Sequence, residues 1–565
     1  MILLNALVEF KKILLKIAWF IPGFLLFAAF PPMGEKVDIL FALAPLMVLS
    51  RGGNPKKSAW CCFQSGAFFW VATLSWMPAI IKNNGPWPLV VLGWAALAAY
   101  CASFFALYGW LSAKYWAWAK GLSSQGNVRF VPLRRLLGCL VVEPVLWCGL
   151  ELVRSRLFGG FAWNQLGVVP ANTSFASPAS LGGVYLLSAV VVLINGVTAG
   201  IAERFIATAR AKMRKTYDAT ALGKFLSLET VFAFALIYGI YHYSYISSFE
   251  RERMVEPLRV AMIQRNFPCC FAAREERPLE IYSNLFERVS MFAPDIAVLP
   301  ESAMGEIGRV DGGRAAAFAA FARRISGAKA ILAGGERKDE FRRLYNSAAL
   351  YEDGRKAQVY DKVHLVPFGE FIPGDKIIPA LQALAPVGSC TPGEEKLLYL
   401  HRHGKKEIPL GVAICFEDTD SALMRSFAAK GARFLCFITN DSWFSNSIEA
   451  QAHAWQATAR AVETGLPVVR TGNSGVSGVI SPNGSVNLLL SDGGKPLVDA
   501  SGVMCDTIAV PCDPSDEGGK SARTVYVKHG DIPLAIIFTL LITAMIMVKY
   551  GHEYKRIRRM PVQIG

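Results

Sequence analysis

A cysteine followed by two carboxylates ends a short apolar run in the second half of the chain. Residues 411–414 read Gly-Val-Ala-Ile, which is typical of a buried strand, and Cys415, Phe416, Glu417 and Asp418 follow directly. Strand ends in α/β proteins are where reactive groups are usually presented. A thiol attacks as the thiolate, so this chemistry requires a base or a cation nearby. The alternative is a structural cysteine, because free cysteines also pack as small hydrophobic residues.

Two other stretches offer the base and the cation. Residues 295–304 read Asp-Ile-Ala-Val-Leu-Pro-Glu-Ser-Ala-Met, an apolar strand that ends in the carboxylate of Glu301. Residues 360–373 contain Lys362 and Glu370. Each residue taken alone has an ordinary interpretation, since a glutamate after a strand is usually solvated and a lysine usually lies at the surface.

In the order Glu, Lys, Cys, these residues resemble the Glu-Lys-Cys triad of the nitrilase (carbon–nitrogen hydrolase) superfamily. The motifs Leu-Pro-Glu-Ser, Lys-Val-His-Leu-Val-Pro-Phe-Gly-Glu-Phe and Ile-Cys-Phe-Glu carry the resemblance, which spans about residues 258–512. It implies that Cys415 is the nucleophile, Glu301 the general base and Lys362 the group that stabilises the oxyanion. His364 is a possible rival base, although its place in the Lys-Val-His motif favours a structural role.

The composition indicates a membrane protein. Of the 565 residues, 53% are hydrophobic and 18% are charged, whereas soluble domains average about 25% charged residues. A helix needs about 20 apolar residues to cross the bilayer core. Candidate spans lie at residues 13–30, 37–49, 58–81, 89–111, 136–152, 181–201, 225–247 and 532–548. The span at 37–49 is short and interrupted by Pro45, so it is expected to be tilted, broken or re-entrant.

The basic residues predict the topology of these spans. With a cytoplasmic N-terminus, 22 Lys and Arg residues fall in inside segments and only four in short outside loops, which follows the positive-inside rule. The net charge of +15 is thereby explained without nucleic acid as a partner. The expected domains are a membrane domain at 1–247 with about seven spans, an extracytoplasmic domain at 248–530, and a last span with a basic cytoplasmic tail at 531–565.

Short apolar runs alternate with helical patterns from residue 258 onwards. This alternation predicts an α/β layered domain, and the resemblance specifies the four-layer α-β-β-α sandwich of nitrilases. The expected strands are 258–264, 296–299, 330–333, 347–351, 410–414, 434–439, 467–470 and 478–480, and the expected helices are 277–292, 313–325, 421–430 and 449–465. The predicted fold class is therefore a multi-pass α-helical membrane domain of about eight helices plus a nitrilase-like sandwich.

A nitrilase-like domain between seven spans and an eighth resembles the apolipoprotein N-acyltransferase family of bacterial envelopes. The shared motifs include Trp147, Glu151 and Arg154, the loop Gly-Gly-Phe-Ala-Trp, the run Asn-Asp-Ser-Trp-Phe at 440–444 and the run Arg-Thr-Gly-Asn-Ser-Gly at 470–475. The resemblance implies transfer of an acyl chain from a phospholipid to the α-amino group of a lipoprotein's diacylglyceryl-cysteine. It further implies an enzyme of the bacterial inner membrane with its catalytic domain on the periplasmic face, without cofactor or metal, and monomeric.

The same resemblance assigns supporting roles. Glu370 would orient Lys362 or Glu301, Glu417 would be a supporting carboxylate, and a backbone N–H near Phe416 would help to bind the oxyanion. Asn346 and Trp443 would support the site or its loops, with core packing as an equally good interpretation. Two positions depart from the family pattern: Phe416 stands where tyrosine is also common, and no tryptophan follows Gln264-Arg265-Asn266.

Several features leave alternatives open. Glu143, Glu151 and Arg154 are functional candidates, with a structural Glu151–Arg154 pair at helix spacing as the alternative. The loop 158–167 is either interfacial or an ordinary connector. The pair His401-x-His403 is more typical of a solvated turn than of a metal site. An oxidising compartment would allow one or two disulfides, with Cys505–Cys512 as a candidate. The cysteines that would face it are Cys269, Cys270, Cys390, Cys436, Cys505 and Cys512.

Three rival functions remain at this level. A membrane-anchored amidase would share the triad and release ammonia. A transporter with a binding-only outer domain would also suit seven spans followed by one domain. An inactive scaffold is the third, against which the intact Glu301, Lys362 and Cys415 argue.

Overall fold

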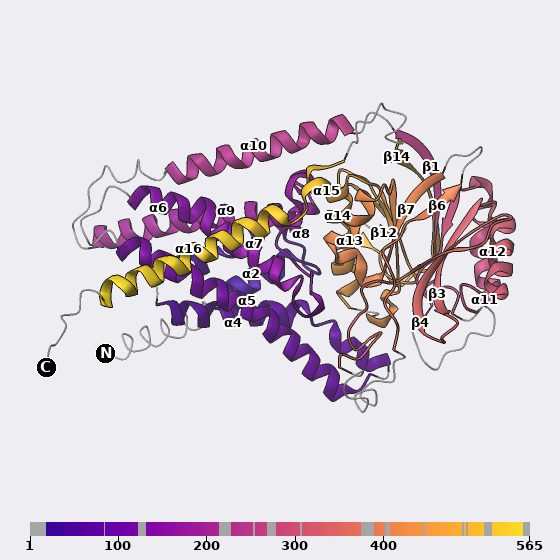
Figure 1. Cartoon of the computed structure of the whole chain (residues 1–565), viewed down its shortest axis with the longest axis horizontal. Helices are drawn as coiled ribbons and strands as arrows, with labels where there is room; N and C mark the ends of the chain where they lie inside the picture. Colours follow the sequence, from indigo (N-terminus) through magenta and orange to yellow (C-terminus); the bar gives the residue numbers. More distant parts are fainter. Residues whose placement is uncertain are drawn as a thin grey trace.

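The computed structural model contains a body of helices and a body built on two β-sheets (Figure 1). It describes residues 19–52, 54–83, 85–121, 131–213, 228–251, 255–267, 278–305, 308–374, 389–401, 407–444, 447–488, 491–492, 495–512 and 523–557. Both the strand-rich segment and the last helix follow α10 (Leu228–Arg251) in the chain. The last helix, α16 (Ile532–Ile557), returns along α7, so the sheets are an insertion between helices of one bundle (Figure 1).

The helical body contains three described helices that are long and apolar enough to cross a membrane: Trp87–Lys120, Leu133–Arg154 and Ala179–Thr208. Ile532–Val548 is a shorter apolar helix. The expected eight spans are therefore matched only in part, and the beginning of the first span lies outside the described residues. The other elements here are α2 (Ile21–Ala29), η1 (Lys36–Leu40), α3 (Ala44–Gly52), α4 (Pro55–Thr73), η2 (Met77–Asn83), α5 (Trp87–Gly121), α6 (Val131–Leu137), η4 (Gly138–Val142), α7 (Glu143–Arg154), η5 (Leu157–Gly159), α8 (Val168–Ala171) and α9 (Ala179–Met213).

Local sequence explains where these helices begin and break. Asn54 caps α4, because its side chain accepts a hydrogen bond from the Lys56 N–H at 2.9 Å and Pro55 occupies the first turn. The predicted span at 37–49 is broken, as its length and Pro45 indicated: η1 ends at Leu40 and α3 starts at Ala44.

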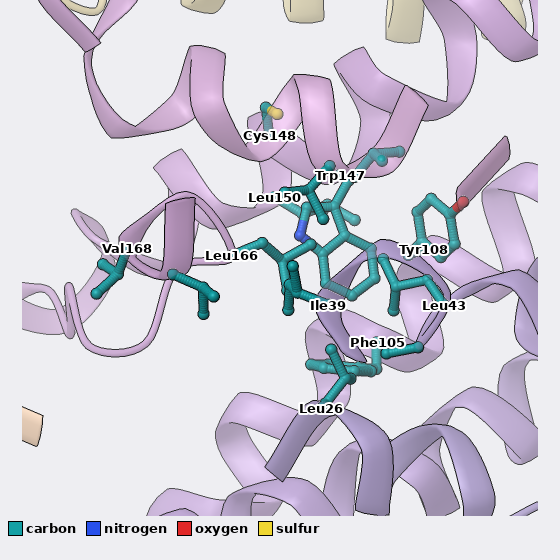
Figure 2. Packing of buried hydrophobic residues seen from close by; sticks show 14 of the residues in the cluster. Leu26, Ile39, Leu43, Phe105, Tyr108, Trp147, Cys148, Leu150, Leu166 and Val168 are labelled. Atoms are coloured by element: carbon teal, nitrogen blue, oxygen red, sulfur yellow. The ribbon is translucent and has the colours of Figure 1, made fainter. Parts of the chain in front are cut away.

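Aromatic side chains fill the core of the helical body. Trp147 of α7 packs edge-on against Phe105 and Tyr108 of α5, with ring centroids 5.0 Å apart in both pairs. Figure 2 shows Trp147 at the centre of this cluster, between Leu150 of its own helix and Leu43. A buried ion pair between Arg51 and Glu143 (2.6 Å) ties α3 to α7. Glu143 is therefore a structural partner of Arg51.

The second body contains two six-stranded sheets. Their orders are β14-β1-β2-β3-β4-β5 and β11-β10-β9-β8-β7-β6, and a two-stranded sheet joins β12 to β13. The strands are β1 (Val255–Gln264), β2 (Ile296–Val298), β3 (Ala330–Lys338), β4 (Leu344–Glu352), β5 (Gln358–Asp361), β6 (Leu398–His401), β7 (Glu407–Ile414), β8 (Phe434–Thr439), β9 (Val468–Gly472), β10 (Gly478–Ile480), β11 (Val486–Leu488), β12 (Ser491–Asp492), β13 (Lys495–Pro496) and β14 (Gly502–Pro511). All eight predicted strands form.

Alternation along each strand creates the layers. On β1, Val260 and Met262 point into the core between the sheets, whereas Ala261 and Ile263 point into a second core under two helices. Those helices are α11 (Pro278–Glu287), which η7 (Ser290–Phe292) follows before β2, and α12 (Gly313–Ser326). On the outer face of the other sheet lie α13 (Ser421–Ala429) and α14 (Glu449–Thr464), whose apolar residues belong to the same buried cluster as both faces of that sheet. The layers are α-β-β-α, as expected (Figure 1).

Polar contacts join α14 to the helical body. The Val184 N–H donates to Glu463 at 2.7 Å, and the Asn172 side-chain amide donates to the Trp455 carbonyl at 3.0 Å. Helix α15 (Val525–His529) follows the sheets and leads into α16. The candidate disulfide is wrong: Cys505 lies within extended β14 and Cys512 directly follows this strand, so the chain holds the two thiols apart and both are free. Cys269-Cys270 lie outside the described residues.

Candidate active site

Cys415 occupies a sharp turn at the end of a central strand. Strand β7 ends at Ile414, and Cys415 begins η9 (Cys415–Thr419) with φ of +54°. A non-glycine residue in this left-handed region is strained, by about 1–3 kcal/mol, and keeps that conformation only when its surroundings hold it. The surrounding structure thus maintains this turn, which presents the Cys415 thiol beyond the edge of the sheet.

The carboxylate of Glu417 holds one side of this turn. It is fully buried and accepts four hydrogen bonds: from the backbone N–H groups of Ile414 (2.8 Å), Val363 (2.7 Å) and His364 (3.1 Å), and from the Tyr360 hydroxyl (2.9 Å). The donors belong to the strand before Cys415, to β5 and to the segment directly after β5. Glu417 therefore joins the Cys415 turn to the segment that carries Lys362.

Lys362 is a buried cation with a fixed partner. It directly follows β5, only 1% of its surface is exposed, and its Nζ lies 2.8 Å from Glu370 Oε2. The Asn346 side-chain amide on β4 donates to both Glu370 (2.7 Å) and Glu301 (2.7 Å). Asn346 thus connects the two carboxylates around Lys362, an arrangement that packing alone would not require.

Glu301 lies in the turn that follows β2. The backbone of this turn packs against Gly334 of β3, where an added Cβ would lie 2.7 Å from the Glu301 Cα and 3.0 Å from Ile438 of the other sheet. Only a glycine leaves room for the turn at this place. The two sheets therefore meet directly behind the carboxylate.

The charges of the three residues are coupled. Burial, followed by the negative charge of Glu301, raises the pKa of the Cys415 thiol well above its ordinary value, and Lys362 opposes the shift. Burial also raises the pKa of Glu301, again against Lys362. Burial lowers the pKa of Lys362, but Glu370, Cys415 and Glu301 outweigh burial and raise it. At rest the site holds a protonated thiol beside a permanent ammonium and a carboxylate of increased basicity.

The residue after the nucleophile faces the helical body. The Phe416 ring stacks at 13° on Phe161 (6.0 Å) and on Trp163 (6.2 Å) from the loop that precedes α8. Arg154 holds this loop by donating to the Phe161 and Trp163 carbonyls, both at 2.8 Å. The loop 158–167, for which an interfacial loop or an ordinary connector was expected, thus forms the helical body's side of a contact with the sandwich.

Glu151 of α7 also holds this loop in place. Its carboxylate accepts hydrogen bonds from the Trp147 indole and the Leu166 N–H, both at 2.9 Å. The alternative of a direct Glu151–Arg154 ion pair is wrong for the described geometry, because both side chains bind the loop instead. A small cavity of about 20 Å³ lies beside them, and half of its lining residues are aromatic side chains of α4, α5 and α7.

Other predicted residues lie further from the triad. The Trp443 carbonyl, in η10 (Asp441–Phe444), accepts a hydrogen bond from Asn83 of the helical body at 2.8 Å. His364 pairs with Asp420 at 2.8 Å, which together with its backbone contact to Glu417 supports the structural role. His401 lies between Glu352 (2.5 Å) and Glu407 (2.8 Å), and His403 is outside the described residues.

Sequence reasoning did not find a buried charged cluster behind the nucleophile's turn. Its members are Asp418, Asp441, Glu449, His453 and Arg470, all at most 4% exposed. They come from η9, η10, α14 and β9, and only their burial within apolar segments would have indicated them.

The double-sheet sandwich and the Glu301, Lys362 and Cys415 arrangement define a carbon–nitrogen hydrolase domain. The family model "Carbon-nitrogen hydrolase" matches residues 259–500, and the model "Apolipoprotein N-acyltransferase N-terminal domain" matches residues 22–197. A carbon-nitrogen hydrolase from Helicobacter pylori G27 is 19% identical, with 45% of this chain and 89% of that chain covered and a TM-score of 0.33. The assignment of the fold rests on the sheet order and the family models.

Relatives named apolipoprotein N-acyltransferase cover both bodies. The protein from Geobacter metallireducens is 30% identical over 475 residues, which cover 82% of this chain and 84% of the relative. The protein from Gloeobacter violaceus is 29% identical (81% and 82% covered), and that from Allorhizobium ampelinum is 27% identical (93% of each chain). The chain belongs to the apolipoprotein N-acyltransferase family, and it is an N-acyltransferase of the carbon–nitrogen hydrolase superfamily.

Proposed function

We propose that this N-acyltransferase carries the acyl group as a thioester on Cys415 between a phospholipid donor and the α-amine of a diacylglyceryl-cysteine acceptor. The observation that supports this most directly is the connection Glu301–Asn346–Glu370–Lys362, which fixes a base and a cation around a strained cysteine turn. Acyl transfer through a thiol needs these three groups in fixed positions.

In the first half-reaction, Glu301 removes the proton of the Cys415 thiol as sulfur attacks the ester carbonyl carbon. The oxyanion of the tetrahedral intermediate is stabilised by the Lys362 ammonium, helped by a backbone N–H near Phe416. When the C–O bond breaks, Glu301 returns the proton to the leaving oxygen, which gives a lysophospholipid and the thioester. The raised pKa of Glu301 suits a residue that must both accept and donate this proton.

In the second half-reaction, the free amine attacks the thioester carbonyl carbon. Glu301 accepts the amine proton, the C–S bond breaks, and the Cys415 thiol is restored with that proton. Glu370 keeps Lys362 directed at the oxyanion in both steps, because its carboxylate is itself held by Asn346 and by the Val366 N–H (2.8 Å).

The Phe416 contact supports a lipid substrate. The nucleophile's neighbour stacks on a loop of the helical body, so the site lies where the sandwich meets the helices. An acyl chain delivered from a bilayer reaches such a site without crossing water, and the apolar surroundings slow hydrolysis of the thioester.

The architecture proposed with this function has eight spans. Residues 1–247 form the membrane domain, residues 248–530 the catalytic domain on the periplasmic face of the inner membrane, and residues 531–565 the last span and cytoplasmic tail, in a monomer. The basic asymmetry of the short loops supports this orientation.

The persistence of the thioester separates the transferase from an amidase of the same fold. Purified protein in phospholipid should accumulate acyl mass on Cys415, measured by mass spectrometry. A diacylglyceryl-cysteine peptide with a free α-amine should discharge it as an N-acylated peptide, and the same peptide acetylated at that amine should not. Rapid hydrolysis in water, with no effect of the peptide amine, would contradict acyl transfer and leave an amidase.

A further inference from the structure

Five ionisable side chains form a buried cluster on the far side of the Cys415 turn from Glu417. Asp418 lies in η9 itself, Asp441 begins η10, Glu449 and His453 share one face of α14, and Arg470 lies on β9. Their exposed fractions are 1–4%. The mechanism proposed above uses none of them, yet charges at this depth are expensive unless they are paired.

His453 is the centre of the cluster. Its Nε2 lies 2.9 Å from Asp418 Oδ1, and its Nδ1 lies 3.0 Å from Asp441 Oδ1 and 3.4 Å from Glu449 Oε1. A neutral imidazole has one N–H donor and one lone pair. Nδ1 is hydrogen-bonded to Asp441, whereas Nε2 lies at ion-pair distance from Asp418 without hydrogen-bond geometry. A carboxylate opposite each nitrogen favours the imidazolium, because the lone pair of a neutral ring would face an anion, and Asp418 and Asp441 outweigh burial and raise the pKa of His453.

His453 also contacts Phe416 indirectly, through the ring of Trp163. Trp163 of the helical body packs on the imidazole at 5.7 Å and stacks on Phe416 at 6.2 Å. His453 thus holds both Phe416, directly after Cys415, and Asp418, three positions after it. This is the kind of surrounding structure that a strained φ of +54° needs.

We propose that His453 is a positioning residue whose imidazolium fixes the Cys415 turn against α14 and the Trp163 loop, so that the thiol faces Glu301 and Lys362. The inference rests on Cys415 as the proposed nucleophile. His453 acts through Asp418 and through the Trp163–Phe416 stack, and it takes no proton from the reacting groups.

The charges that face His453 determine how the cluster depends on pH. They are Asp418 from η9, Asp441 from η10, Glu449 from its own helix, and Arg470 from β9, whose guanidinium lies 3.5 Å from Asp418 and 3.3 Å from Asp441. Burial, then Asp441, raises the pKa of Glu449, so it holds its proton. With Glu449 protonated, the negative charges of Asp418 and Asp441 balance the positive charges of His453 and Arg470. Removal of His453 alone leaves one negative charge without a counter-charge.

The test measures the reactivity of Cys415 itself, in the full-length protein in phospholipid nanodiscs. His453→Gln is compared with His401→Gln, because His401 also lies between two carboxylates but is paired with Glu407, at the opposite end of β7 from Cys415. The double variant His453→Gln/Asp418→Asn removes one cation and one anion, so the cluster stays balanced and the protein should fold. The readouts are the rate of Cys415 alkylation by iodoacetamide, resolved by peptide mass spectrometry, acyl-enzyme formation, and the melting temperature.

Both His453 variants should slow Cys415 alkylation and acyl-enzyme formation together, on the order of 10²-fold, as expected when a reacting atom is displaced by about 1 Å. The double variant should do so with a melting temperature close to that of the parent, and His401→Gln should leave both rates unchanged. Parent-like alkylation in the double variant would overturn the positioning role of His453. Fast alkylation of Cys415 without acyl transfer in the parent would instead refute the proposed function.

Discussion

At the scale of single residues, the site combines a cysteine that is a weak acid with a lysine that keeps its proton. Burial raises the pKa of the Cys415 thiol, so the thiolate forms only as Glu301 takes the proton. Lys362 opposes that shift and remains charged because Glu370 lies 2.8 Å away. In the proposed mechanism, the Cys415 thiol therefore stays protonated and unreactive until a substrate carbonyl is in place.

Lys362→Met should slow formation and discharge of the acyl-enzyme by about 10²–10³-fold, because both steps pass through an oxyanion that loses its donor. Mass spectrometry of Cys415 against time measures both rates. Lys329→Met is the control, since Lys329 also pairs with a carboxylate, Asp295 at 2.7 Å, but is 48% exposed and outside the site. Equal rates in the two variants would remove Lys362 from the mechanism.

Cys415→Ala should abolish the acyl-enzyme without lowering the melting temperature by more than a few degrees, since alanine nearly fills a cysteine site. Covalent acyl mass elsewhere on the chain with full turnover would eliminate Cys415 as the nucleophile. Both measurements use the protein in phospholipid, where the parent accumulates the thioester.

The pH dependence should follow Glu301. Burial places its pKa above the ordinary value, so acyl-enzyme formation should rise with pH above the range of an exposed glutamate. Asn346 donates to this carboxylate and lowers its pKa. Asn346→Leu should therefore raise the pKa and move the acid limb to higher pH. Asn487→Leu, which removes a donor to the exposed Asp506, should leave the limb in place; a limb that Asn346→Leu does not move would exclude Glu301 as the base.

At the scale of secondary-structure elements, the three residues proposed to react, Glu301, Lys362 and Cys415, follow the ends of β2, β5 and β7. The close contact of β3 with the turn after β2 fixes where Glu301 lies. Gly334 has no room for a Cβ, because Glu301 Cα, Pro300 O and Ile438 Cδ1 would all lie within 3.0 Å of it. The position of the base thus depends on how the two sheets pack.

Gly334→Ala should displace the Glu301 turn and lower the acylation rate on the order of 10²-fold. Gly313→Ala in α12 is the matched control, because an added Cβ there meets no atom within 4 Å and alanine favours a helix. Measuring the acylation rates and melting temperatures of both variants tests whether the Gly334 contact positions Glu301. An unchanged rate in Gly334→Ala would show that the turn adapts and that the contact is not needed for activity.

At the scale of the whole molecule, the orientation across the membrane determines which substrates reach the site. Asp353→Cys, at a side chain 94% exposed on the sandwich, should react with a membrane-impermeant maleimide in intact spheroplasts. Lys56→Cys, at the exposed start of α4, should react only after permeabilisation. Labelling by mass spectrometry in the opposite pattern would reverse the proposed topology.

The class of fold could be predicted from the sequence alone, and the proposed reacting residues were selected from it. The strands come from apolar runs such as 411–414, and Glu301, Lys362 and Cys415 follow strands or their neighbouring turns. These are local properties: period-two burial, strand ends and motif order can be found without knowing which segments meet.

Only the tertiary structure decided what holds those residues. Asn346 joins Glu301 to Glu370, and His453 faces Asp418 and Asp441, through contacts between segments far apart in the chain. The stack of Phe416 on Trp163 joins segments that are more than 250 positions apart and that fold into different bodies. Such partners depend on how two sheets and a helical body pack, and hydrophobic periodicity along one strand or helix carries no information about them.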